Sequence, residues 1–72
     1  MYQARDYEVR IWWSSEDAIF VAQVTELPGM MAHGDTRAEA FDNIQTALEG
    51  ALQWKQELGD ELPSPIHYQA AA

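Results

Sequence analysis

The side chains in this sequence that could support acid–base or metal chemistry are carboxylates, two histidines and a few serines. Asp6 and Glu8 flank Tyr7 at the start of a stretch with the alternation of a β-strand, which would place both carboxylates on one strand face. Such a pair could bind a divalent ion, and metal-dependent cleavage of nucleic acids uses carboxylate clusters of this kind. Most pairs with this spacing are only solvated strand faces, so we expect no catalytic or metal site here.

The other candidates for chemistry have simpler interpretations. His33 could be a metal ligand, but a lone histidine at the end of a strand is more often a hydrogen-bonded structural residue. Ser14 and Ser15 have no neighbouring histidine to act as a base, so we interpret them as turn residues. The chain has no cysteine, which excludes disulfides and a thiolate zinc site. We therefore predict a protein that is not an enzyme and that uses no cofactor.

The chain carries a strong excess of negative charge. Its 12 Asp and Glu residues against 4 Lys and Arg residues give a formal net charge of −8. A nucleic-acid-binding domain normally concentrates basic residues in a patch, whereas here they are scattered along the chain: Arg5, Arg10, Arg37 and Lys55. Direct binding of DNA or RNA is therefore not expected. The charge suits a basic protein partner, or it simply keeps the surface solvated.

The length allows one domain with a thin core. A chain of 72 residues, 47% of them hydrophobic, buries only about 60% of the surface that its unfolded form exposes. Without disulfides, self-association is the remaining way to stabilise so small a core. We predict one domain over residues 1–72, with its core at 6–68 and a frayed tail at 69–72. No segment has the ~20 apolar residues of a membrane span, and no signal peptide is recognisable, so we expect a cytoplasmic protein.

Alternation with period two predicts a β-hairpin followed by a third strand. Residues 7–13 and 18–24 alternate between two faces and are rich in β-branched and aromatic side chains. The polar residues between them are few enough for an antiparallel hairpin. Pro28 and Gly29 should end the second strand, because proline has no ladder donor and glycine can turn at positive φ. Residues 30–33 then form a short third strand.

A single helix is predicted from Thr36 to Gly59. Thr36 and Glu39 have the spacing of a capping box, in which each side chain bonds the backbone N–H of the other residue, and Gly59 suits a left-handed cap. Gly50 lies in the middle of the helix, where it either allows another backbone to approach or is simply tolerated. Apolar residues recur at helical spacing and predict one buried stripe: Phe41, Ile44, Ala47, Leu48, Ala51, Trp54 and Leu58.

The junction Gly34-Asp35-Thr36 between strand and helix has a structural and a binding interpretation. Gly34 would permit a sharp turn, Asp35 would complement the positive end of the helix dipole, and Thr36 would cap the helix. The alternative is an anion site at the helix N-terminus, which the acidic residues already present there disfavour. We interpret the junction as a device that redirects the chain.

The order of elements predicts an α+β fold. Pro63 and Pro65 exclude a helix after Gly59 and fit an extended entry to a short edge strand at residues 66–68. The expected architecture is a three-stranded antiparallel sheet, one amphipathic helix packed on one face of that sheet, and a short C-terminal strand. No element remains to cover the other face.

The uncovered face of the predicted sheet is a candidate interface. Strand alternation places Trp12, Ile19 and Val21 on it. A large apolar face on so small a chain is typical of an interface, and tryptophan is enriched at interface hot spots. We predict self-association through these three residues, as a dimer or a dimer of dimers (a tetramer). The simpler alternative is that Trp12 is an ordinary exposed aromatic.

Several short motifs resemble the HicB-like antitoxin family. The strand "YEVRI", the run "FVAQVTELPG", the junction "GDTRAEA", the helical "NIQTAL" and the closing "LPSP" occur in the order and spacing of that family, over about residues 7–65. The most specific parts are Leu27-Pro28-Gly29, Gly34-Asp35-Thr36 and then Glu39-Ala40. The resemblance implies a truncated ribonuclease-H-like fold in which three strands, a helix and a last short strand follow one another.

The resemblance also implies a function. HicB-like domains bind and block HicA, a small basic toxin that cleaves RNA, and full-length members add a C-terminal DNA-binding module. Only residues 67–72 follow the closing "SPI" at residues 64–66, so we do not expect that module's function. The loop carboxylates that we expect to contact a toxin are Glu16, Asp17 and Glu26. The alternative is a self-associating HicB-like domain with no toxin partner and no enzymatic activity.

Overall fold

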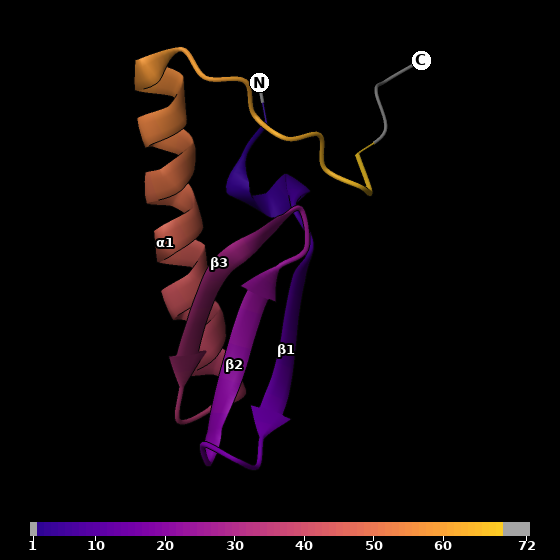
Figure 1. The fold of residues 1–72 in the computed structure, drawn as a ribbon, viewed down its shortest axis with the longest axis vertical. Coiled ribbons are helices and arrows are strands. Elements are labelled where there is room, and N and C mark those ends of the chain that lie inside the picture. The colour runs from indigo at the N-terminus through magenta and orange to yellow at the C-terminus, as the bar shows by residue number, and fades with distance from the viewer. Residues whose placement is uncertain (1, 69–72) are drawn as a thin grey trace.

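The fold is a three-stranded antiparallel sheet with one long helix lying along one of its faces (Figure 1). The structure is a computed structural model, and it describes residues 2–68. The α+β class predicted from the sequence is confirmed. The strands follow one another in the sheet in the order β1-β2-β3. The elements are η1 (Ala4–Asp6), β1 (Val9–Ser14), β2 (Ile19–Val24), β3 (Leu27–Gly34) and α1 (Arg37–Leu58).

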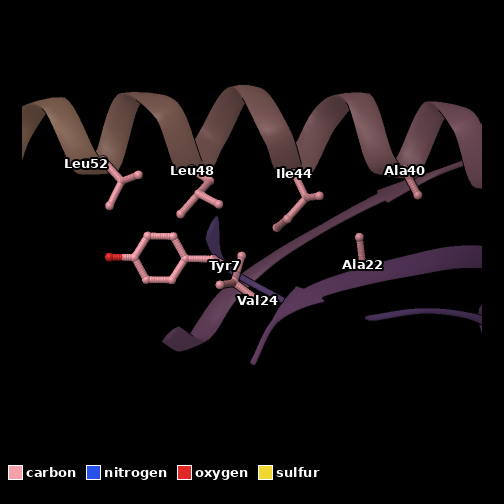
Figure 2. Close-up of a cluster of buried hydrophobic side chains, with 7 residues drawn as sticks. All are labelled: Tyr7, Ala22, Val24, Ala40, Ile44, Leu48 and Leu52. Atoms are coloured by element: carbon pink, nitrogen blue, oxygen red, sulfur yellow. The ribbon is translucent and has the colours of Figure 1, made fainter. Parts of the chain in front are cut away.

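The core lies between α1 and the sheet face beneath it (Figure 2). Figure 2 shows one row of side chains on α1 pointing toward the sheet, where Tyr7, Ala22 and Val24 meet them. The row repeats every four residues, because side chains at i and i+4 lie one above the other on a helix. Its members are Ala40, Ile44, Leu48 and Leu52, all of them buried.

The buried stripe of α1 is narrower than its apolar sequence suggests. The predicted members Ile44 and Leu48 are fully buried, but Phe41, Trp54 and Leu58 are exposed. The reason is the small size of the sheet. Phe41 lies beside the buried row, where a sheet of three strands about 4.8 Å apart does not reach it. The C-terminal end of α1 extends past the strands (Figure 1), because 22 helical residues are longer than strands of six to eight residues, so Trp54 and Leu58 near that end stay in solvent.

The strand β3 begins earlier than the sequence predicts. The motif at residues 27–29 does not end the second strand; it forms the first part of β3, and the turn lies at residues 25–26. A bulge after Gln23 adjusts the register, so that Val24 pairs with Leu27. The turn between β2 and β3 therefore has only two residues, fewer than a turn that continued to Gly29 would have.

Pro28 and Gly29 have roles other than turning the chain. Pro28 is tolerated because β3 is an edge strand, where a missing N–H can face away from the sheet. Its carbonyl accepts a hydrogen bond of 2.7 Å from the Gln23 side chain. Gly29 does not have a positive φ, so the predicted reason for a glycine at this position is wrong.

Position 34 requires a glycine because the backbone of α1 lies very close to it, and not because the chain must turn there. Its φ is outside the left-handed region, so the predicted conformational role is wrong. A Cβ built at Gly34 would lie 2.5 Å from the backbone nitrogen of Ala40 and 2.8 Å from the carbonyl carbon of Glu39. The first turn of α1 therefore rests directly on the end of β3, and a larger residue would push the two elements apart.

The ends of α1 are capped largely as predicted. The Thr36 hydroxyl accepts the Glu39 N–H at 3.0 Å, but the Glu39 carboxylate accepts the N–H of Asp35 at 3.2 Å and not that of Thr36. Gly59 has a φ of 74° and ends the helix in the left-handed conformation. At Gly50 an added Cβ would meet no atom within 4 Å, so the tolerated-glycine alternative holds within the described chain.

The C-terminal segment does not form the predicted strand. Residues 60–65 belong to no helix or strand, and the chain then turns at residues 66–67, where the Tyr68 N–H donates to the Pro65 carbonyl at 3.2 Å. The Ile66 N–H bonds to the side chain of Glu26, so it is not free for a strand ladder. Figure 1 shows this segment crossing from the end of α1 past the N-terminal η1. The tail expected at residues 69–72 lies outside the described residues.

The two glycines give a matched test of this packing. Gly34→Ala should lower the free energy of unfolding by about 1–3 kcal/mol, because the clashing atoms are backbone atoms that cannot rotate away. Gly50→Ala adds the same methyl group in open space and should raise the free energy of unfolding by about 0.5–1 kcal/mol. Denaturant unfolding of both variants at one protein concentration measures the difference. Equal stability of Gly34→Ala and wild type would contradict the close approach.

Candidate functional site

Among residues 2–68, no helix or strand covers the sheet face opposite α1, and we call it the open face. On the helix side, Val9, Ile11 and Phe20 pack against the core, so the alternate residues of each strand point away from the helix. The register places Trp12 opposite Val21, and Val21 opposite His33. The three predicted interface residues therefore share one face, as the sequence predicts, and their role in self-association stays a prediction.

The open face combines an exposed aromatic side chain with a shallow hollow. Trp12 on β1 is 39% exposed and Met31 on β3 is 52% exposed, while Ile19 and Val21 on β2 are half-buried. Beside Trp12, across β2, lies a hollow of about 410 Å³. It is lined by Asp17, Ile19, Val21, Met31, Ala32 and His33. A bulky side chain and a recess that could receive one thus occupy the two sides of the same face.

The sheet is free of carboxylates. None of the strands β1, β2 and β3 contains an Asp or a Glu residue, although the chain has 12 of them. Arg10 on β1 forms an ion pair with Glu8, with its Nε 3.0 Å from Glu8 Oε1. The strands thus add no carboxylate to the open face, and Asp17 of the β1–β2 turn is the carboxylate that lines its hollow.

The other two tryptophans lie elsewhere. Trp13 points to the helix side at the end of the sheet, where its ring meets Phe20 edge-to-face with centroids 5.0 Å apart. The Arg37 guanidinium lies 4.8 Å from the centroid of the same Phe20 ring, a cation–π arrangement. Trp54 projects from the flank of α1 and is 62% exposed. The alternation in the sequence correctly predicts that Trp12 and Trp13 point to opposite faces of the sheet. The prediction that Trp54 belongs to the buried stripe of the helix is wrong.

Two of the predicted partner-binding carboxylates are free to reach a partner. Glu16 and Asp17 are exposed in the turn between β1 and β2. Ser14 closes this turn, with its hydroxyl 3.4 Å from Asp17 Oδ2. Ala18 completes it at a φ of 54°, a left-handed conformation that costs a non-glycine residue about 1–2 kcal/mol. The turn thus presents two carboxylates at the edge of the open face.

Glu26, the third predicted partner-binding residue, is occupied within the chain. It is half-buried, and its carboxylate accepts the Glu8 N–H at 3.1 Å and the Ile66 N–H at 2.9 Å. The residue therefore joins the start of β1 to the C-terminal segment. Both partners are backbone groups, and one is 40 residues away, so no sequence pattern could reveal this role. Its contact with a toxin stays a prediction.

Glu8 is the centre of a second polar cluster that the sequence did not indicate. Besides Arg10, its carboxylate accepts the Thr25 hydroxyl at 2.6 Å and lies 2.6 Å from His67 Nε2. The hydrogen bonds with His67, Thr25 and Arg10, in that order, hold the pKa of Glu8 at about 2, well below its usual value of 4.5. Glu8 is therefore ionised at neutral pH and anchors His67.

These contacts fasten the C-terminal segment to the rest of the domain. The Tyr7 hydroxyl donates to the Pro63 carbonyl at 2.7 Å, and the rings of Tyr2 and Tyr68 meet edge-to-face with centroids 5.0 Å apart. Pro65 is buried. Burial raises the pKa of the Tyr7 hydroxyl, with nearby Tyr2 and acidic groups adding to the rise. The segment is thus held by Tyr2, Tyr7 and Glu8, which lie before and after η1, and by Glu26 in the β2–β3 turn.

The carboxylate pair considered at the start of the sequence does not form. Asp6 belongs to η1, where its carboxylate accepts the Gln3 N–H at 2.8 Å, and Glu8 precedes the first residue of β1. The two side chains therefore do not share a strand face. Among residues 2–68 no three His, Cys, Asp or Glu side chains lie close enough together to hold a metal ion. His33 contributes its backbone carbonyl to a bond of 2.8 Å from the Asn43 side chain.

The fold and this surface define a small α+β domain with one covered and one open sheet face. No family model matches the chain, and neither a curated protein nor a solved structure does. Within the described chain, α1 is too polar to cross a lipid bilayer.

The Glu8 cluster makes stability depend on acid in a defined range. Because the pKa of Glu8 is lower in the folded chain than its usual value, the ionised carboxylate stabilises the fold above about pH 4.5, and this contribution is lost as the pH falls toward about 2. Glu8→Gln should therefore be less stable than wild type at neutral pH, and the two should converge in acid. Denaturant unfolding of both proteins at a series of pH values from neutral to about pH 2 measures the difference in their free energies of unfolding. Glu16→Gln, in an exposed turn, is the control, and parallel curves for Glu8→Gln and wild type would contradict the assignment.

Proposed function

We propose that this chain is a HicB-like antitoxin module that neutralises a small basic HicA-like RNA-cleaving toxin by direct binding. The observation that carries the proposal is the acidic surface, displayed on a sheet-and-helix domain whose motifs resemble that family. The truncated ribonuclease-H-like fold is part of the proposal. The strand, strand, strand, helix order supports it, although residues 66–67 form a turn where the family pattern implies a strand.

The distribution of charge supports a basic partner. The carboxylates excluded from the strands gather in the turns and on the outer face of α1, where Glu39, Asp42 and Glu49 are exposed. A concentrated negative potential attracts a basic protein over long range and raises its association rate. The turn residues Glu16 and Asp17 can then make the short-range contacts, because they lie at the tip of the hairpin and are exposed.

The proposed mechanism is occlusion. A ribonuclease that binds RNA does so through basic groups that contact phosphates. An acidic protein seated on those groups competes with the substrate for the same charges, so the antitoxin needs no catalytic residue of its own. Because Glu26 is already bonded to two backbone amides, Glu16 and Asp17 carry the contact in this proposal.

The second candidate function is a self-associating domain without a toxin partner. The open sheet face with Trp12 and its adjoining hollow favours it. The two functions differ in whether a basic partner binds, so one titration separates them.

The test is titration against a HicA-like protein encoded in the same genome, with RNA cleavage and association rate as readouts. Binding should suppress cleavage, and the association rate should fall at least about tenfold from low to high salt, because the Debye length shrinks from about 10 Å at 0.1 M to about 3 Å at 1 M. Asp17→Asn combined with Glu16→Gln should weaken binding more than Glu49→Gln, a matched helix control. With both proteins folded, absence of binding at low salt would leave the self-associating domain.

A further inference from the structure

We infer that the open sheet face is the interface between two copies of this chain, with Trp12 of each copy seated in the hollow across β2 of the other. The hollow is the recess lined by Asp17, Ile19, Val21, Met31, Ala32 and His33. This inference does not rest on the toxin-binding proposal, because it requires no second protein.

Charge identifies the occupant as a second copy. Two molecules that each carry a net charge of −8 repel one another wherever their carboxylates meet. The strands are the part of the described chain without carboxylates, and Arg10 on that face is already balanced by Glu8. Asp17 is the one carboxylate that lines the hollow, so two copies meet less repulsion through this face than through the acidic surface of α1, to which a basic partner would be drawn.

The positions of the tryptophan and the hollow define the symmetry. Trp12 is on β1, one edge strand, while the hollow lies between β2 and β3, toward the other edge. A twofold axis that runs parallel to β2, in the plane between two facing sheets, places β1 of each copy over β3 of the other. Each Trp12 then meets the partner's hollow, and the contact is self-complementary, as a twofold interface must be. An axis perpendicular to the strands would instead place β1 of one copy over β1 of the other, so Trp12 would not meet the hollow.

The size of the face sets the strength of the dimer. Three strands about 4.8 Å apart and about six residues long, at about 3.4 Å per residue, give a face of roughly 14 by 20 Å. This is smaller than the about 800 Å² per partner of a standard stable interface. We therefore expect a reversible dimer whose population depends on concentration, with Trp12 as its hot spot.

The test is sedimentation equilibrium of the full chain over a wide concentration range. Wild type should show a monomer–dimer equilibrium, and Trp12→Glu should raise its dissociation constant at least about 30-fold, the effect of losing one hot spot. Trp54→Glu is the matched control. Trp54 is more exposed than Trp12 but lies on the flank of α1, so this variant should dimerise like wild type. Circular dichroism establishes that each variant is folded.

A second variant keeps the test decisive if Trp12→Glu does not fold. Met31→Glu places a charge in the hollow at a side chain that is already 52% exposed, and it should also dissociate the dimer. The inference would be overturned if the wild-type chain stayed monomeric over the whole concentration range. It would also be overturned if the dimer survived the sheet-face substitutions and was lost in Trp54→Glu. It would likewise be overturned if Trp12→Glu left the mass unchanged but abolished binding of the basic toxin, because the face would then belong to the toxin.

Discussion

The contact between Gly34 and the first turn of α1 determines how the rest of the domain is arranged. A side chain at Gly34 would lie within 2.5 Å of the Ala40 nitrogen, so strand and helix meet there with no room between their backbones. Ala22 and Ala40, both fully buried, continue this close packing into the core. The helix is thereby held along one face, and the three strands leave their other face uncovered. The open face that we regard as functional is thus a consequence of the packing that forms the core.

Charge is segregated by secondary structure in a way that separates two kinds of binding. The strands contain no carboxylates, while the turns and the outer face of α1 contain many. Long-range attraction of a basic protein depends on the acidic surfaces, whereas contact between two copies depends on the open sheet face. In our two proposals the dimer contact uses the open sheet face and the toxin contact uses the β1–β2 turn, and the two contacts adjoin at Asp17, which lines the hollow.

The C-terminal segment shows how side chains can replace a strand ladder. Pro63 and Pro65 have no N–H groups, so backbone pairing over this stretch would be incomplete. The carboxylates of Glu8 and Glu26 and the Tyr7 hydroxyl hold the segment instead. Because one of these bonds joins a carboxylate to a histidine, the attachment depends on ionisation states as backbone pairing would not. The low pKa of Glu8 reflects this, because the bonds that hold the segment favour the ionised carboxylate.

Local patterns in the sequence were enough to predict the hairpin, the helix with its Thr36 and Gly59 caps, and the alternation that places Trp12 away from the core. Each of these depends on near neighbours or on a simple period, which a sequence displays directly. The tertiary structure decided which helix residues are buried, why Gly34 must be glycine, and how Glu8, Glu26 and His67 are used. Those features join residues far apart in the chain, and their geometry exists only once the helix has packed on a sheet that is too small to cover all of its apolar side chains.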